Sequence, residues 1–184
     1  VLMLDLDHFK KVNDTHGHAA GDAVLTTFAA MLTQSIREDD RATRWGGEEF
    51  LVICAETDQT QAEALARRLL TSVPSACAGV LPEGWRQTVS IGIASYPRDG
   101  QRYGELLRGA DVAMYVAKQT LSRYSCYAPQ QDNNSTSRLA LLSDFLDALK
   151  ADHLVLHYQP KIDIASGKAM GVEALVRWQH VQHG

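Results

Sequence analysis

Two acidic groups, far apart in the sequence, have residue types and spacing that suggest chemistry. Gly46-Gly47-Glu48-Glu49 lies between two strand-like runs. Adjacent glycines there predict a tight hairpin, because glycine enters positive φ freely. Asp5 and Asp7 end an apolar run, Val1–Leu6, which we interpret as a buried central strand. Carboxylates held close together repel, and a bound divalent cation would explain them. A solvated hairpin tip is the alternative reading of Glu48 and Glu49 taken alone.

The composition is that of a globular domain in a reducing compartment. The chain has 184 residues, 45% of them hydrophobic and 22% charged, with a net charge of -4 that argues against a nucleic-acid polymer as partner. Cys54, Cys77 and Cys126 fit neither a zinc pattern nor a disulfide framework, which favours the cytoplasm. We find no signal peptide and no apolar run of the roughly 18 residues that a membrane span needs. Because the chain opens without Met, directly in a strand, we expect an internal piece of a longer protein, with any membrane attachment outside it.

Periodicity supplies the elements that must position these acids. Apolar stripes predict helices over residues 8–13, 22–36, 58–70 and 103–118, and apolar or alternating runs predict strands over 1–6, 41–45, 50–54, 88–96 and 123–127. The order predicts an α/β (α+β) fold with a mixed, mostly antiparallel central sheet flanked by helices. Residues 14–21 are expected to form a loop, in which His16 and His18 are better read as hydrogen-bonding groups than as metal ligands.

A second set of elements follows a polar stretch, 128–137, which we interpret as a linker. An amphipathic helix is predicted over 138–150, and two strands over 153–162 and 170–178. Their connection is too short for a parallel crossover, so these strands should be antiparallel. Glu173 stands in an apolar run, where a carboxylate is costly unless it is paired or bound to a metal, and Arg177 is the simplest partner.

With both acidic groups in view, several linked motifs resemble the GGDEF diguanylate cyclase family. They are Leu4-Asp5-Leu6-Asp7-His8-Phe9-Lys10, Asn13-Asp14, His18, Gly21-Asp22, Gly46-Gly47-Glu48-Glu49-Phe50, Ser90-Ile91-Gly92-Ile93-Ala94 and Ala110-Asp111-Val112-Ala113-Met114-Tyr115-Val116-Ala117-Lys118. Tyr158-Gln159-Pro160-Lys161 and Glu173-Ala174-Leu175-Val176-Arg177-Trp178 resemble the opening of an EAL phosphodiesterase domain, a truncated TIM-like barrel. The resemblance implies a GGDEF domain over 1–127 that lacks its N-terminal part, a linker over 128–137, and an EAL fragment over 138–184.

The resemblance also implies an activity and roles for particular residues. Two GTP molecules would condense to cyclic di-GMP and two pyrophosphates, in a homodimer of facing GGDEF domains. Mg²⁺ or Mn²⁺ would be held by Asp5, the backbone carbonyl of Leu6, Glu48 and Glu49, and the implied catalytic residues are Glu48, which accepts the proton, and Lys10. Substrate contacts are implied for Asn13, His18, Asp22, Lys118 and Arg123, a product-binding inhibitory site for Arg37 and Asp40, and EAL-type contacts for Gln159, Glu173 and Arg177.

Three departures from the family pattern leave alternatives open. The segment before the first strand is absent, and Lys118 is followed by Gln119-Thr120-Leu121-Ser122-Arg123 instead of the family's Gly-Arg-Asn. An EAL barrel needs about 250 residues, so the fragment is not expected to hydrolyse cyclic di-GMP. The chain is therefore expected to be an active cyclase or, alternatively, a GTP-binding module that regulates the attached phosphodiesterase. A purely structural domain would leave Asp5, Glu48 and Glu49 unexplained.

Overall fold

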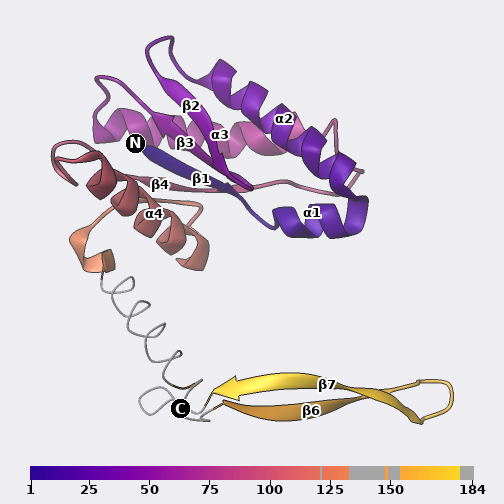
Figure 1. Cartoon of the computed structure of the whole chain (residues 1–184). Coiled ribbons are helices and arrows are strands. Elements are labelled where there is room, and N and C mark those ends of the chain that lie inside the picture. Colours follow the sequence, from indigo (N-terminus) through magenta and orange to yellow (C-terminus); the bar gives the residue numbers. More distant parts are fainter. Residues whose placement is uncertain (121, 133–147, 149–153, 179–184) are drawn as a thin grey trace. The chain divides into compact units, whose positions relative to one another are not determined.

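The computed structural model describes residues 1–120, 122–132, 148 and 154–178 (Figure 1). The chain divides into two compact units, Val1–Asp132 and Asn133–Gly184. The helix predicted over 138–150 lies outside the described residues, apart from Ala148. Every helix in the described part of the chain falls short of what is needed to cross a membrane.

A five-stranded mixed sheet, in the order β2-β3-β1-β4-β5, is the centre of the first unit. β1 lies in the middle and pairs antiparallel with β3 and with β4, whereas β5 pairs parallel with β4. This confirms the predicted mixed, mostly antiparallel sheet, and all five residues of β1 are buried as an apolar central strand requires. The strands are β1 Leu2–Leu6, β2 Arg41–Gly46, β3 Glu49–Ile53, β4 Val89–Ile93 and β5 Tyr124–Cys126.

Four helices cover the sheet, with α2 and α3 over one face and α4 over the other (Figure 1). Two predicted boundaries are wrong. Residues 14–21 are mostly helical, because Gly17, at a φ of 82°, reverses the chain between α1 and α2 within one residue. α3 continues past residue 70 in spite of Pro74, since Val73 and Cys77 extend its buried stripe. The helices are α1 Phe9–His16, α2 His18–Ser35, α3 Gln59–Cys77 and α4 Tyr103–Thr120.

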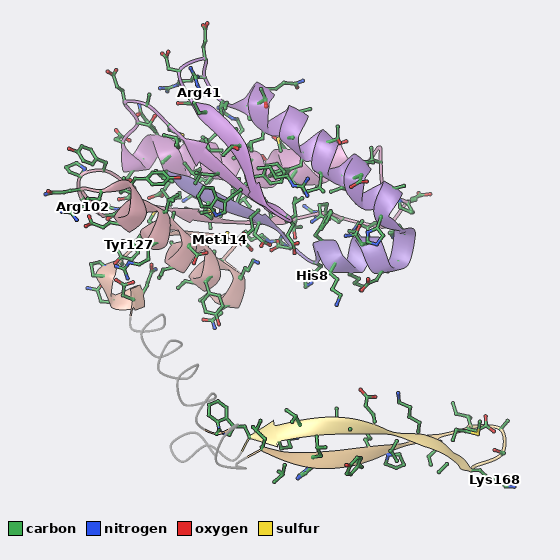
Figure 2. The ribbon with its side chains drawn as sticks, in the orientation of Figure 1. His8, Arg41, Arg102, Met114, Tyr127 and Lys168 are labelled. Atoms are coloured by element: carbon green, nitrogen blue, oxygen red, sulfur yellow. The ribbon has the colours of Figure 1, made fainter. Side chains whose placement is uncertain are left out.

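The alternation of side chains along β1 decides which face receives the acids. Leu2, Leu4 and Leu6 belong to the core under α1, α2 and α3. Met3 belongs to the core under α4, together with Leu51 and Met114, which lies between that helix and the sheet (Figure 2). Since residues two apart on a strand share a face, Asp5 lies on the α4 side of the sheet.

α4 crosses β4 at Gly92, and the crossing requires glycine. A Cβ there would lie 1.9 Å from the Ala110 carbonyl oxygen and 2.2 Å from the Met114 nitrogen. The backbone of the helix therefore rests almost directly on the strand. This close approach holds the last turns of α4, which carry Lys118, over the strand ends.

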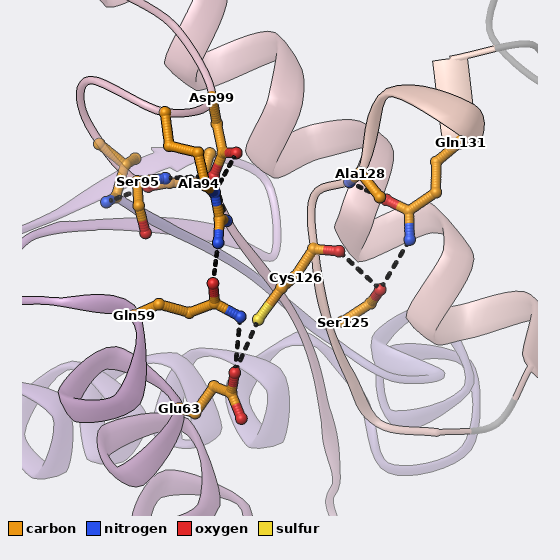
Figure 3. A network of polar contacts seen from close by, with 11 residues as sticks. Gln59, Glu63, Ala94, Ser95, Asp99, Ser125, Cys126, Ala128 and Gln131 are labelled. Carbon is orange, nitrogen blue, oxygen red and sulfur yellow. Dashed lines mark hydrogen bonds and ion pairs between the residues drawn. The ribbon is translucent and has the colours of Figure 1, made fainter.

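A polar network ties the β5 edge to the rest of the unit (Figure 3). Glu63 Oε1 accepts hydrogen bonds from Gln59 Nε2 at 2.8 Å and from Cys126 Sγ at 3.3 Å. Gln131 Nε2 donates to Ser125 Oγ at 3.1 Å, in the short 3₁₀ turn Pro129–Asp132 that follows β5. The first five residues of the segment predicted as a linker, 128–132, therefore belong to the first unit.

In the second unit the structure describes an antiparallel hairpin, β6 Leu154–Ile162 and β7 Ala169–Trp178, as predicted. The proposed pairing of Glu173 with Arg177 is wrong. These residues lie four positions apart on one strand, about 13 Å at the usual rise. Instead Glu173 Oε2 lies 3.5 Å from Lys161 Nζ of the facing strand, and the Glu173 side chain is 54% exposed. Nothing buries this carboxylate in the described residues of the unit.

Candidate active site

The acidic strand end and the acidic hairpin meet in the sheet. Asp5 of β1 pairs in register with Glu49 of β3, and the Leu6 N–H donates to the Glu48 carbonyl at 3.2 Å. Both pairings follow from the antiparallel register, in which Leu4 lies opposite Phe50. Asp5 is thus brought to one end of adjacent strands together with Glu48 and Glu49, which lie more than 40 residues later in the sequence.

The hairpin that carries Glu48 is fixed by its own backbone. Gly47 adopts a φ of 48°, and Arg44 Nε donates to its carbonyl at 2.8 Å. Trp45 is the extra residue of a register shift between Arg44 and Gly46, so the strand bends just before the glycines. The predicted hairpin is confirmed, with its turn one residue later than expected: Gly46 ends β2, and Gly47 and the half-buried Glu48 form the tip.

The charges at this strand end are only partly compensated. Asp5 is 6% exposed, and its Oδ1 lies 2.8 Å from the ammonium of Lys118. Burial nevertheless raises the pKa of Asp5 above its ordinary value, against the effect of Lys118. Burial also raises the pKa of Glu49, and the charges of Asp5 and Asp111 add to that rise. The site therefore favours any ligand that brings positive charge.

The donor chemistry fits the predicted divalent cation, although no complete ligand shell is formed. Carboxylate and carbonyl oxygens are the ligands that Mg²⁺ prefers, and Asp5, Leu6, Glu48 and Glu49 present such groups on the two adjoining strands. Among the described residues, no three acidic, histidine or cysteine side chains gather as a metal centre would require. The Lys118 ammonium takes the position of a cation beside Asp5.

The residues predicted to bind guanine come from the junction of α1 and α2. The Asn13 side chain packs against Gly21, where a Cβ would lie 2.0 Å from Asn13 Oδ1. His18 and Asp22 are four residues apart on α2, on one face, and both are exposed. Lys10 is exposed on α1, which begins directly after the acidic end of β1. The predicted site residues of this region therefore surround the helix junction next to the acids.

A pocket of about 370 Å³ lies beside Asp7, between the start of α1, β4 and the end of α4. It is lined by Asp7, His8, Thr88, Ser90, Ala117, Lys118 and Arg123. Arg123 has a φ of 69°, a left-handed conformation that is uncommon for arginine. The structure thus brings two of the predicted substrate contacts, Lys118 and Arg123, to one pocket.

This architecture agrees with known proteins. The profile described as "Diguanylate cyclase, GGDEF domain" matches residues 1–123. The chain belongs to the GGDEF family of diguanylate cyclases. A profile for the EAL domain matches residues 142–184.

Curated relatives match along the whole chain, which spans about a quarter of their length. The chain is 42% identical to the bifunctional diguanylate cyclase/cyclic di-GMP phosphodiesterase MucR of Pseudomonas aeruginosa, covering 100% of this chain and 27% of MucR. It is 38% identical to the cyclic di-GMP phosphodiesterase PdeR of Escherichia coli, covering 100% of this chain and 28% of PdeR. Among solved structures, an active GGEEF domain of a diguanylate cyclase from Vibrio cholerae has a TM-score of 0.63 at 26% identity, covering 69% of this chain and 81% of that one.

The predicted inhibitory residues of the GGDEF unit line a second pocket, of about 570 Å³, away from the acids. The Asp40 carboxylate binds backbone groups and not the Arg37 guanidinium. Its Oδ2 accepts the backbone N–H of Arg37 at 3.0 Å, and its Oδ1 accepts that of Ala55 at 3.1 Å. The Arg37 side chain is exposed, and Arg68 of α3 lines the same pocket. Sequence reasoning missed Arg68, since no local pattern links it to Arg37.

Other residues that sequence reasoning missed surround the acids of the GGDEF unit. Asp111 lies seven residues before Lys118, on one face of α4, and this spacing was the available signal. Thr88 and Ser90 of the β4 region bind Asp7, and only the fold brings them together. In the EAL segment, Gln159 lies opposite Glu173 in the hairpin register, and Arg177 Nη1 donates to the Val176 carbonyl at 3.0 Å.

Proposed function

We propose that residues 1–127 act as a diguanylate cyclase within a tandem GGDEF–EAL protein. The observation that carries this proposal is the pairing of Asp5 with Glu49, beside Glu48 and under Lys118, at one end of β1 and β3. Burial raises the pKa values of Asp5 and Glu49, so their ionised carboxylates are costly without a compensating cation, which suits a site for a nucleotide with its divalent cation. The likeness to a bifunctional relative and to an active GGEEF domain supports the same conclusion.

The reaction joins two GTP molecules in two equivalent steps. A ribose 3′-oxygen of one GTP bonds to the α-phosphorus of the other, the bond from that phosphorus to the pyrophosphate oxygen breaks, and pyrophosphate leaves. Glu48, at the hairpin tip, accepts the proton of the attacking hydroxyl. Mg²⁺ or Mn²⁺, when held by Asp5, the Leu6 carbonyl, Glu48 and Glu49, neutralises charge on the phosphates.

The remaining predicted residues bind and orient the substrate. The Asn13 amide and the Asp22 carboxylate offer an acceptor and donor set that matches the edge of guanine, with His18 beside them. Lys10, Lys118 and Arg123 supply positive charge to the phosphates. One domain holds one GTP, so the two-fold symmetric product requires two copies of the domain facing each other. We place this chemistry in the cytoplasm, where GTP is available.

We further propose that the pocket of Arg37 and Asp40 binds cyclic di-GMP as an inhibitor. In the EAL fragment, we assign Glu173 to a metal and Gln159 and Arg177 to the dinucleotide. Because the chain holds only the first strand pair of that domain, these three residues would act once the rest of the barrel is present.

The test is the synthesis of cyclic di-GMP from GTP and Mg²⁺ by the longer protein, followed by chromatography. Glu48→Gln keeps the shape of the side chain and removes the base, so the rate should fall by about 100-fold to 10,000-fold. Glu83→Gln, an exposed carboxylate between α3 and β4, is the matched control and should leave the rate unchanged. Equal rates for Glu48→Gln and wild type would refute the assignment.

A regulatory GTP-binding module is the second candidate. It is favoured by the altered stretch after Lys118, where Arg123 occupies a left-handed position, and by the likeness to a relative named only as a phosphodiesterase. In that case the same experiment would show GTP binding with no pyrophosphate release by the wild-type protein.

A further inference from the structure

Asp7, which follows β1, is hydrogen-bonded through both carboxylate oxygens and its backbone N–H to residues 88–90. Its Oδ2 accepts the Thr88 hydroxyl at 2.7 Å, and its Oδ1 accepts the Ser90 hydroxyl at 2.7 Å. Its backbone N–H donates to the Thr88 carbonyl at 2.9 Å. Gln87, 1% exposed, donates its amide to the carbonyls of Asp7 and Thr88 at 2.8 and 2.9 Å. We call Asp7, Thr88 and Ser90 the Asp7 cluster.

The Asp7 cluster forms part of the wall of the pocket that also holds Lys118 and Arg123. Lys118 and Arg123 together suit a polyphosphate ligand. The carboxylate of Asp7 in the same wall would repel such a ligand. A carboxylate that accepts two hydroxyl hydrogen bonds is held in a fixed direction and has part of its charge satisfied. Lys118, meanwhile, forms its ion pair with Asp5 at 2.8 Å.

We propose that Thr88 and Ser90 are positioning residues for nucleotide binding. By donating to both oxygens of Asp7, they hold that carboxylate toward β4 and satisfy part of its charge, so that it competes less with the phosphates for Lys118 and Arg123. The inference rests on the proposed function, since it assigns a nucleotide to this pocket. It gives Asp7 a role different from that of Asp5: Asp7 orders the pocket and does not hold the cation.

Loss of the two hydroxyls then has a specific consequence. In the Thr88→Val, Ser90→Ala double variant, Asp7 keeps its charge and loses its two hydroxyl donors, and the cations that line the same pocket are Lys118 and Arg123. Asp7 therefore competes with phosphate, and nucleotide affinity falls. Adding Asp7→Asn to the same background removes the competing charge, so affinity should recover, although the variant then carries three changes.

The experiment measures binding of 3′-deoxy-GTP with Mg²⁺ by calorimetry, using the same longer protein as the cyclase assay. This nucleotide lacks the attacking hydroxyl, so binding is measured without turnover. We expect the double variant to bind about tenfold more weakly than wild type, the factor that corresponds to about 1.4 kcal/mol. Asp7→Asn should restore most of that loss, and Thr88→Ser, which keeps the hydroxyl, should bind like wild type.

Each result decides the matter. Wild-type affinity in the double variant, or a triple variant that binds no better than the double, would overturn the role of Thr88 and Ser90 while leaving the cyclase assignment intact. Failure of the wild-type chain to bind would overturn the proposed function and this inference with it. If circular dichroism shows that the double variant is unfolded, the comparison passes to Thr88→Val against Thr88→Ser, which differ in one hydroxyl, and equal affinity of that pair overturns the inference.

Discussion

Asp5 and Asp40 are both buried aspartates next to strands of the same sheet, and their surroundings are opposite in kind. Asp5 lies beside other acids, with the Lys118 ammonium as its compensating contact, and its pKa is raised by burial. Asp40 accepts a backbone N–H on each oxygen, from Arg37 and from Ala55. At the β1 end the fold leaves charge for a ligand to compensate. At the Arg37 turn it satisfies the acid and leaves the arginine exposed.

The difference teaches how each region is used. A carboxylate with two backbone donors stabilises a turn and contributes little to ligand binding, so the binding group of the Arg37 pocket is the guanidinium. A buried carboxylate with a raised pKa costs stability, and such groups cluster at functional sites. The buried acid at the β1 end therefore lowers stability and is available to a ligand, whereas Asp40 stabilises the turn at Arg37.

Among the substitutions that compare these two regions, the largest effect is expected on inhibition by the product. Arg37→Ala removes a charge-assisted contact to a product phosphate, so the inhibition constant for cyclic di-GMP should rise by about 10-fold to 100-fold. The uninhibited rate should stay unchanged, because the acids lie in the other region. Initial rates measured against added product provide the test, with Arg86→Ala, an exposed arginine before β4, as control. An unchanged inhibition constant would show that cyclic di-GMP does not inhibit by binding at Arg37.

Next in size is a pair of matched substitutions with opposite effects on stability. Asp40→Asn places an amide where two backbone N–H groups need acceptors, so the free energy of unfolding should fall by about 1–3 kcal/mol. Asp5→Asn removes a buried charge whose pKa is raised, so at neutral pH it should not lower that free energy and should raise it. Urea unfolding of both variants at pH 7 compares them. A loss of stability in both variants would show that Asp5, like Asp40, stabilises the folded protein.

The smallest effect is a dependence on pH at Glu49. Its pKa is raised in the folded protein, so the folded state holds this proton more tightly than the unfolded state does. Stability from this group is therefore lost as pH rises from the ordinary value of 4.5 through the raised value. Relative to wild type, Glu49→Gln should gain stability over that window and then level off, by less than about 1 kcal/mol because solvent screens the site. A gain that grew toward lower pH would contradict the sign.

The fold could be read from the sequence where the signal was local. The apolar run of β1, the stripes of α2, α3 and α4, and the Gly46-Gly47 turn depend on residues within a few positions of one another. Helix boundaries were predicted wrongly where a single residue changes the chain direction, as Gly17 does between α1 and α2. The predicted partner of Glu173 was wrong because Arg177 lies about 13 Å along the same strand, whereas Lys161 approaches Glu173 from the facing strand, which the sequence does not show.

The sequence by itself determined the family, the mixed sheet and the residues able to carry the chemistry, because motifs and periodicity are local properties of the chain. Only the tertiary structure decided what each acid does. Asp5 and Asp7 are two residues apart, yet one pairs with Lys118 across the sheet face and the other binds hydroxyls 81 and 83 residues away. Strand register and helix crossing set those partners, and the partners set whether a carboxylate's charge is satisfied or left for a ligand.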